Sequence, residues 1–468
     1  MNIITNICII NLTTIMKKAA ILTLGAFLLI SSSAMAQENE EVRFNQYGVA
    51  VDRKELHAEA RNNILVLESK DQSYKLWMDN RVMVDGATFW GVGSDYDRIG
   101  NGISIRRARF AVKAQLGKDW YGEVDMDMAD GLFELKDAIV EYDGVKNMEF
   151  KVGNFKEDFS MERTTSSRYL QLIERPMVTQ ALAPSRHLGF QAAYLRDHFR
   201  ASFGTFFQEI AGSEEAGYVQ DNNKDFGRSQ GYSLTSKIGW MPYTQDRKKG
   251  FYLGAKASYR TPKTDVSTSD YGGMRFSTRN STSINRKKYI DTDVIPNVHH
   301  NWLYGTEVGA YWNGLKVQSE WIGTHVSVPG EGYNFGGYYV QLGYALFGGH
   351  QHFNVAEGEF TSIAPGKKWG DVELNLRYDY LDLNHRDVYG GSGENYTAGL
   401  NFYLGNSVKM AINYMYSCND RYANGKGKLV IGHDATGKPT ADFTKAVEPK
   451  GKGGVSYNSI AVRFEVDF

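Results

Sequence analysis

The sequence predicts an all-β fold, a closed transmembrane barrel of sixteen antiparallel strands. Three observations lead to this prediction. The last twelve residues, 457–468, alternate apolar and polar side chains and end at an aromatic residue. The N-terminus carries the features of an exported protein. The composition is polar, yet it suits strands that face lipid on one side only.

The final strand shows the alternation most clearly. Its apolar positions are Ile460, Val462, Phe464, Val466 and Phe468, and most residues between them are polar. Successive side chains of an extended chain point to opposite faces, so one face can meet lipid while the other meets water. An edge strand of a soluble protein would carry the same pattern. The rest of the chain must therefore decide between the two.

The N-terminus predicts a secretory signal peptide. Lysines at 17–18 precede an apolar stretch at 19–30 and the small-residue sequence Ala34-Met-Ala36. We expect cleavage before Gln37, which makes residues 1–36 the signal peptide. Because Met16 begins a better leader, residues 1–15 are expected to be an overlong gene start.

Two regions are expected in the exported chain. Residues 37–73 should form a periplasmic N-terminal segment or plug the foot of the barrel, with a short helix at 53–61. Residues 74–468 should form the barrel, placed in the outer membrane of a Gram-negative cell.

The composition favours membrane-spanning strands over membrane-spanning helices. Charged residues make up 23% of the chain, and no apolar run of about 18 residues follows the leader, which excludes a helical membrane protein. The chain has 49 Gly, 29 Tyr and 24 Phe but 9 Pro, which fits many strands joined by tight turns. A large soluble all-β protein is the alternative that composition leaves open.

Cysteine content and charge exclude other classes. Cys418 is the one cysteine after the leader, so an intramolecular disulfide or a cysteine-based metal site is excluded. The formal net charge is −1, which indicates no particular anionic partner. We expect no nucleic-acid partner, no cofactor and no bound metal.

Period-two alternation places sixteen candidate strands. Either side-chain parity could be defended for 132–143 and 188–196. An even number of strands returns both chain ends to the periplasmic side of a closed barrel. The predicted strands are 74–90, 102–117, 119–129, 132–143, 147–155, 188–196, 198–209, 231–241, 250–261, 303–312, 315–326, 333–346, 370–382, 394–404, 407–418 and 457–468.

The lengths of the connections provide a second check. From a periplasmic start, the short turns fall on the periplasmic side and the long polar segments on the extracellular side, as in bacterial barrels. The long segments are 156–187, 210–230, 262–302 and 419–456. The connection 347–369 breaks the rule, and a missed strand pair there would change the strand count.

A barrel of sixteen strands is wide enough for an aqueous channel, so passage of small hydrophilic solutes is the expected function. Guanidinium groups present forked donors to phosphate or carboxylate oxygens. Arg107 and Arg109 could equally pair across the wall with Glu123, Asp125 or Asp127. The bases expected on the lumen face include Arg81, Arg107, Arg109, Lys113, Lys151 and Arg200.

Several motifs resemble one known family, the phosphate-selective porins O and P. The resemblance is strong from about 75 to 195 and looser toward the C-terminus. The motifs are Ser104-Ile-Arg-Arg-Ala-Arg-Phe110, Gly117-Lys-Asp-Trp-Tyr-Gly-Glu-Val-Asp125, Leu135-Lys-Asp-Ala-Ile-Val-Glu-Tyr142, Val152-Gly-Asn-Phe-Lys-Glu-Asp-Phe-Ser160, Glu174-Arg-Pro176, Pro184-Ser-Arg-His-Leu-Gly189 and, later in the chain, Gly370-Asp-Val-Glu-Leu-Asn-Leu-Arg-Tyr-Asp-Tyr380.

The resemblance implies a homotrimeric porin in contact with outer-membrane lipid and lipopolysaccharide. Its third extracellular loop, 156–187 here, would fold into the lumen and narrow it. Family members bind small anions such as phosphate and polyphosphate with arginines on the wall and bases at the constriction. The positions that match by motif are Arg107, Arg109, Lys156, Arg175 and Arg186.

Other functions stay open at this point. A general porin, or one for sugars or carboxylates without phosphate selectivity, fits the same fold. A non-channel anchor or receptor is a further class. A lipid hydrolase would need an outward-facing Ser and His; His325 is such a histidine, but Ser319 lies too far along the strand. Asp221–Gly227 has part of a calcium-loop spacing, and His299-His300 could bind a metal, but solvated loops are favoured at both.

Overall fold

The computed structural model describes two compact units, divided after Glu55. Within the first unit, β1 (Arg43–Phe44) pairs with β2 (Ala50–Val51) as a small hairpin. The predicted signal peptide lies outside the described residues. The described residues are 43–51, 54–61, 63–207, 228–229, 231–242, 248–262, 264–265, 272–280, 282–405, 407–449 and 453–468.

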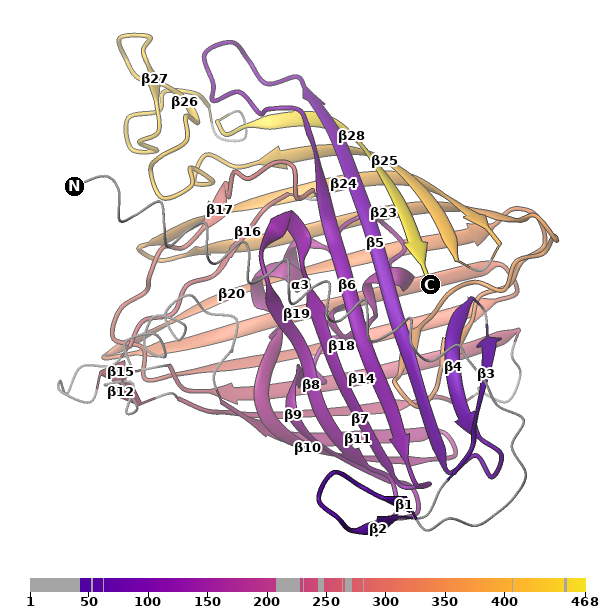
Figure 1. The fold of residues 1–468 in the computed structure, drawn as a ribbon. Coiled ribbons are helices and arrows are strands. Elements are labelled where there is room, and N and C mark those ends of the chain that lie inside the picture. The colour runs from indigo at the N-terminus through magenta and orange to yellow at the C-terminus, as the bar shows by residue number, and fades with distance from the viewer. Residues whose placement is uncertain are drawn as a thin grey trace, which may run out of the picture. The chain divides into compact units, whose positions relative to one another are not determined.

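The second unit contains a closed antiparallel barrel with sixteen wall strands in its described part (Figure 1). Each strand pairs with the next along the chain, and the last pairs with the first to close the wall. All sixteen predicted strands are confirmed, with ends that differ by a few residues. They are β5 (Tyr74–Trp90), β6 (Gly102–Leu116), β7 (Trp120–Asp127), β8 (Glu134–Tyr142), β9 (Met148–Lys156), β10 (Arg186–Arg196), β11 (Phe199–Phe206), β13 (Ser233–Trp240), β14 (Lys249–Arg260), β18 (His300–Trp312), β19 (Leu315–Val328), β20 (Glu331–Ala345), β23 (Gly370–His385), β24 (Val388–Leu404), β25 (Val408–Asn419) and β28 (Ser456–Asp467).

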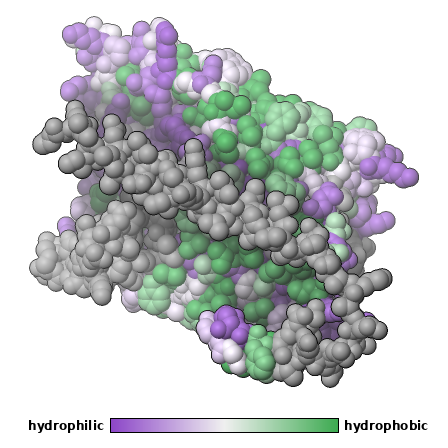
Figure 2. All heavy atoms as spheres, in the orientation of Figure 1, coloured by the Kyte–Doolittle hydropathy of each residue, from purple (hydrophilic) through white to green (hydrophobic). Residues whose placement is uncertain are grey.

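Side chains of the wall alternate as the sequence predicts. In β23, Glu373, Asn375 and Arg377 are buried on the inward face, whereas Leu374 and Leu376 are exposed on the outward face. Figure 2 shows hydrophobic side chains gathered over the middle of the wall and hydrophilic ones toward its ends. The apolar face is therefore the one that contacts lipid.

The segment 157–185, here called the inner loop, lies inside the barrel. It contains α2 (Met161–Thr164), the 3-10 turn η2 (Ser167–Tyr169) and α3 (Met177–Leu182). Backbone N–H groups of this segment donate to carboxylates on the inward face of the wall, from Met161 to Glu307 at 3.0 Å and from Met177 to Asp379 at 3.0 Å. Figure 1 shows α3 within the ring of strands.

The unexpectedly long connection 347–369, here called the periplasmic hairpin, also folds inward. Its short strands β21 (Phe353–Asn354) and β22 (Glu359–Phe360) pair with each other and not with the wall, so the strand count is unchanged. Phe353 and Phe360 pack with Met161 of the inner loop and with Tyr252 and Tyr311 of the wall. This apolar cluster explains the extra length, because a short turn could not reach the inner loop.

The N-terminal part of the second unit corrects the predicted helix at 53–61. Residues Leu56–Arg61 form β3, which pairs with β4 (Ile64–Ser69). β4 in turn pairs with the first residues of β5, near Lys75. The pairing of β28 with β5 begins later in β5, at Arg81. Strand pairing thus overrides the local helical tendency.

Among the described residues, no helix has both the length and the apolar character needed to cross a membrane. The remaining elements are short. These elements are η1 (Ala129–Gly131), β12 (Arg228–Ser229) paired with β15 (Thr264–Asp265), β16 (Ser277–Thr278) paired with β17 (Ile290–Asp291), and β26 (Gly432–His433) paired with β27 (Pro439–Thr440).

Candidate functional site

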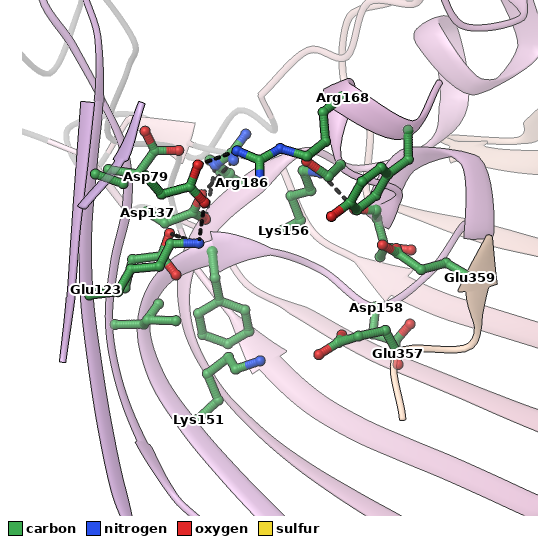
Figure 3. A pocket seen from close by; sticks show the side chains of 18 of the residues that line it. Asp79, Glu123, Asp137, Lys151, Lys156, Asp158, Arg168, Arg186, Glu357 and Glu359 are labelled. Carbon is green, nitrogen blue, oxygen red and sulfur yellow. Dashed lines mark hydrogen bonds and ion pairs between the residues drawn. The ribbon is translucent and has the colours of Figure 1, made fainter. Parts of the chain in front are cut away.

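A polar cavity of about 370 Å³ lies inside the barrel, between strands β5 to β11, the inner loop and the periplasmic hairpin (Figure 3). Opposite charges line it in near balance. The eight bases are Arg81, Arg109, Lys113, Lys151, Lys156, Arg168, Arg186 and Arg200, and the seven acids are Asp79, Glu123, Asp125, Asp137, Asp158, Glu357 and Glu359. Six of the eight predicted site residues are among these bases, and Arg107 and Arg175 are not.

The wall bases pair with acids on neighbouring strands. Arg109 contacts Asp125 at 3.1 Å and Asp127 at 3.3 Å. Lys113 lies 3.0 Å from Asp79 and 3.4 Å from Glu123. The cross-wall pairing that the sequence left open therefore occurs for Arg109.

Three more predicted bases are also paired. Arg186 binds Asp137 through two bonds of 3.0 and 2.5 Å. Arg81 contacts Asp467 at 2.9 Å and donates to Ser167 of the inner loop at 2.6 Å. Lys151 lies 3.0 Å from both Glu141 and Glu149. Each base nonetheless carries several N–H donors, so a pair does not exhaust its capacity.

Lys156 and Arg175 hold the backbone of the inner loop. Lys156 donates to the carbonyl of Thr164 at 2.7 Å. Arg175 donates to the carbonyls of Glu162 at 2.8 Å and Thr165 at 2.6 Å. Burial lowers the pKa of Arg175 to about 10, against the attraction of Glu162 and Glu174. Both residues thus set the shape of the inner loop.

Arg107 differs from the other predicted bases. It is 5% exposed, and its guanidinium contacts the sulfur of Met83 at 3.6 Å. In the described part of the chain no carboxylate lies within ion-pair distance, and, unlike Lys156 and Arg175, Arg107 donates to no backbone carbonyl. A charged group that is buried without a counter-charge is costly. Arg107 does not line this cavity, but it is the predicted base with the most to gain from a bound anion.

Arg106 was missed by the sequence analysis. A bulge in the pairing of β5 with β6 sets Met83 opposite Arg107 and Val84 opposite Ile105, which leaves Arg106 outside the register. Arg106 then reaches the inner loop and binds Glu174 at 2.6 Å. The sequence did contain a sign of the bulge. Arg106 and Arg107 are adjacent, and strict alternation would expose one of the two charged side chains to lipid, which is energetically costly.

The carboxylate of Glu174 joins two arginines of different strands. Arg463 of β28 lies 3.7 Å from it and also binds Asp85 of β5 through bonds of 2.7 and 2.8 Å. Burial alone would raise the pKa of Glu174, but Arg106 and Arg463 outweigh burial and hold the pKa at about 2. The inner loop is therefore tied to this end of the wall by charge.

Comparison with known proteins identifies the family. The family model of the phosphate-selective porin O and P matches residues 78–437. The chain belongs to this family. Porin O of Pseudomonas aeruginosa is 21% identical over 396 residues, which cover 78% of this chain and 87% of that protein. An uncharacterized protein of Caulobacter vibrioides is 28% identical over 360 residues, which cover 74% and 69%.

A solved structure agrees on the fold. The in-vitro folded OmpT of Vibrio cholerae matches with a TM-score of 0.51 and 11% sequence identity, over 86% of this chain and 99% of that one. The protein is thus an outer-membrane porin with a sixteen-stranded barrel.

The periplasmic hairpin supplies two acids to this porin that the sequence analysis did not single out. Figure 3 shows Glu357 and Glu359 across the cavity from Glu123 and Asp137. Burial, together with the negative charge of Glu357, raises the pKa of Glu359 to about 7. No sequence pattern indicated these acids, since they reach the cavity only because the hairpin folds inward.

We expect the ion selectivity of the porin to shift toward anions as the pH falls from about 8 to about 6. A carboxyl group with a pKa of about 7 is ionised above that pH and neutral below it, so acidification removes one negative charge opposite Lys156. Reversal potentials in a salt gradient at both pH values measure the change. Glu359→Gln should give the low-pH value at both. A Glu359→Gln channel that keeps the full pH dependence would assign the effect to another group.

The other candidate sites do not assemble. Ser319 donates to the carbonyl of Tyr339 at 2.7 Å, whereas His325 pairs with Asn334 at 2.8 Å, so the two do not meet. Asp221–Gly227 lies outside the described residues. Neither His299 nor His300 belongs to a cluster able to hold a metal in the region that the structure covers.

Proposed function

We propose that this porin is an anion-preferring diffusion channel for small hydrophilic solutes such as phosphate or polyphosphate. The observation that carries the proposal is Arg107, which is buried without a carboxylate partner among the described residues. Arg106 and Arg463 lie close enough to repel its charge, and Glu174 attracts it. A phosphate oxygen would supply the missing counter-charge through forked guanidinium donors.

The paired bases of the cavity suit passage more than retention. An anion that enters must compete with Asp79, Asp125 or Asp137 for its donors, which keeps each contact weak. Conduction requires binding that is favourable enough to enter and weak enough to leave. A second cavity of about 440 Å³ shares Lys113, Glu123 and Lys151 with the first and reaches the turn at Lys118, which supports a path toward the periplasm.

Two further parts of the proposal come from the family alone. We expect a homotrimer, and we expect outer-membrane lipid and lipopolysaccharide around its wall. Chemical crosslinking of the purified porin in detergent measures the oligomeric state. A monomer under conditions that preserve the barrel would contradict the first expectation.

The test of the proposal is selectivity in planar bilayers. Under a potassium chloride gradient the wild-type reversal potential should indicate anion preference, and phosphate should reduce the chloride current. Arg107→Ala should raise the phosphate concentration that halves the current by about tenfold or more, because hydrogen bonds to charged groups contribute about 1.5–3 kcal/mol. The matched control is Arg196→Ala, because Arg196 is a base with a 67% exposed side chain at a periplasmic turn.

Two outcomes would overturn the proposal. One is a cation-selective wild-type channel. The other is unchanged selectivity when Arg107→Ala and Arg109→Ala are combined. A general porin is the second candidate, favoured by the balance of eight bases and seven acids around the cavity. It predicts conductance steps without phosphate block, whereas a non-channel anchor predicts no steps at all.

A further inference from the structure

Three carboxylates meet on the acidic side of the cavity. Ligand atoms of Glu123, Asp125 and Asp137 all lie within 4.8 Å of one another. The cause is local, because the pairing of β7 with β8 slips between Val124 and Met126 and leaves Asp125 out of register. Such bulges re-aim side chains. Figure 3 shows Glu123 and Asp137 side by side on the cavity wall.

Each carboxylate is contacted by a base from one side. Lys113 and the hydroxyl of Tyr121 contact the two oxygens of Glu123, Arg109 contacts one oxygen of Asp125, and Arg186 binds both oxygens of Asp137. These contacts use part of the acceptor capacity, since each carboxylate offers about four lone-pair positions. Of the six carboxylate oxygens, Oδ1 of Asp125 is the one without such a contact among the described residues.

Asp125 is the residue that indicates a ligand. It is 5% exposed, and its Oδ1 atom has no hydrogen-bond partner among the described residues. A buried carboxylate oxygen without a donor loses its hydration and gains nothing in return. A cation at this oxygen would supply its missing partner and could share the remaining lone pairs of Glu123 and Asp137.

We propose that Glu123, Asp125 and Asp137 bind a calcium ion. Calcium takes six to eight oxygen ligands at about 2.3–2.6 Å in flexible geometry, and water of the cavity can complete the set. Side-chain oxygens alone, with no histidine or cysteine, favour a hard cation over a transition metal. Magnesium is less suited, because it demands near-ideal octahedral geometry.

A second acidic cluster, Glu141, Asp143 and Glu149, carries no such proposal. Its members are partly or fully exposed, and in the described part of the chain none has a buried oxygen without a partner. Solvent hydrates these carboxylates, which removes the reason for a bound cation.

Calcium at this site would change the charge of the cavity. The eight bases outnumber the seven acids by one, and the ion would add two positive charges beside Arg109, Lys113 and Arg186. The acidic side of the wall would then attract anions. This consequence for selectivity rests on the proposed function, whereas the binding of calcium does not.

The first test measures binding directly. The porin is refolded into detergent without lipopolysaccharide, stripped with EDTA, and dialysed to equilibrium against radioactive calcium at millimolar concentrations. Wild type should bind a single ion per chain, and Asp125→Asn should weaken binding by about tenfold or more. Asp79→Asn is the matched control, because it removes the same charge from the same cavity outside the cluster.

Fluorescence unfolding curves confirm that each variant is folded. Absence of saturable binding in folded wild type would overturn the proposal. So would wild-type affinity in folded Asp125→Asn.

The second test measures the reversal potential with calcium and with EDTA. Calcium should increase anion preference in wild type and Asp79→Asn, but not in Asp125→Asn. Saturable calcium binding in a cation-selective channel would support the metal site while it overturns the proposed function. An anion-selective channel without calcium binding would overturn the metal site alone.

Discussion

Replacement of Lys256 by methionine should lower the free energy of unfolding by about 3–5 kcal/mol and increase the single-channel conductance. The ammonium group of Lys256 is fully buried and contacts Glu307 at 2.9 Å and Glu320 more closely. The same carboxylates accept the backbone N–H groups of Met161 at 3.0 Å and Glu162 at 2.7 Å. Without the lysine, the buried carboxylate of Glu320 loses its ion-pair partner, and one of the anchors of the inner loop is weakened.

Urea unfolding followed by tryptophan fluorescence measures the first effect, and planar bilayers measure the second. Lys146→Met, on the exposed turn between β8 and β9, is the control and should change neither quantity. Stability equal to that of wild type would show that Lys237, 2.8 Å from Glu307, neutralises this cluster by itself. Reduced stability with unchanged conductance would show that other contacts hold the inner loop.

Replacement of Arg463 by methionine should destabilise the barrel by a similar amount, about 3–5 kcal/mol, through its seam. Arg463 lies on the last strand and binds Asp85 on the first, and both side chains are 2% exposed. Loss of the arginine leaves Asp85 buried and unpaired exactly where the two ends of the chain must meet to close the wall. Folding of the barrel should therefore become less complete as well.

A double variant separates the charge effect from a packing effect. Arg463→Met combined with Asp85→Leu should recover much of the lost stability, because an apolar pair carries no desolvation cost. Heat-dependent mobility in detergent gels and urea unfolding provide the measurements. A double variant no more stable than Arg463→Met would locate the defect in packing or in the lost contact with Glu174.

The barrel could be predicted because its strands obey a local rule. A lipid-facing residue must be apolar, so the apolar residues at every second position of β23 or β28 identify the side of the strand that faces lipid. Even the strands of ambiguous parity, 132–143 and 188–196, were located, since turn residues bound them. The prediction failed at Leu56–Arg61, where pairing with β4 overrides the helical tendency of a short segment.

The candidate site could be predicted only in part. Arg81, Arg109, Lys113 and Lys151 follow from strict alternation, and they line the cavity. Arg106 was not predicted as a site residue, because a bulge removes it from the alternation. The acids that neutralise each base could be named only as alternatives, because register between strands depends on turns and bulges throughout the wall.

The sequence by itself determined the strands, their inward and outward faces, the closure of the ends and the family. Each of these properties follows from a pattern that repeats along the chain and can be read from residues close together in the sequence. Only the tertiary structure decided that Arg107 is left without a carboxylate partner in the described residues, that Glu359 faces the cavity, and that Asp125 joins Glu123 and Asp137. Those outcomes depend on contacts between residues far apart in the chain and on local slips in register, which no periodic pattern encodes.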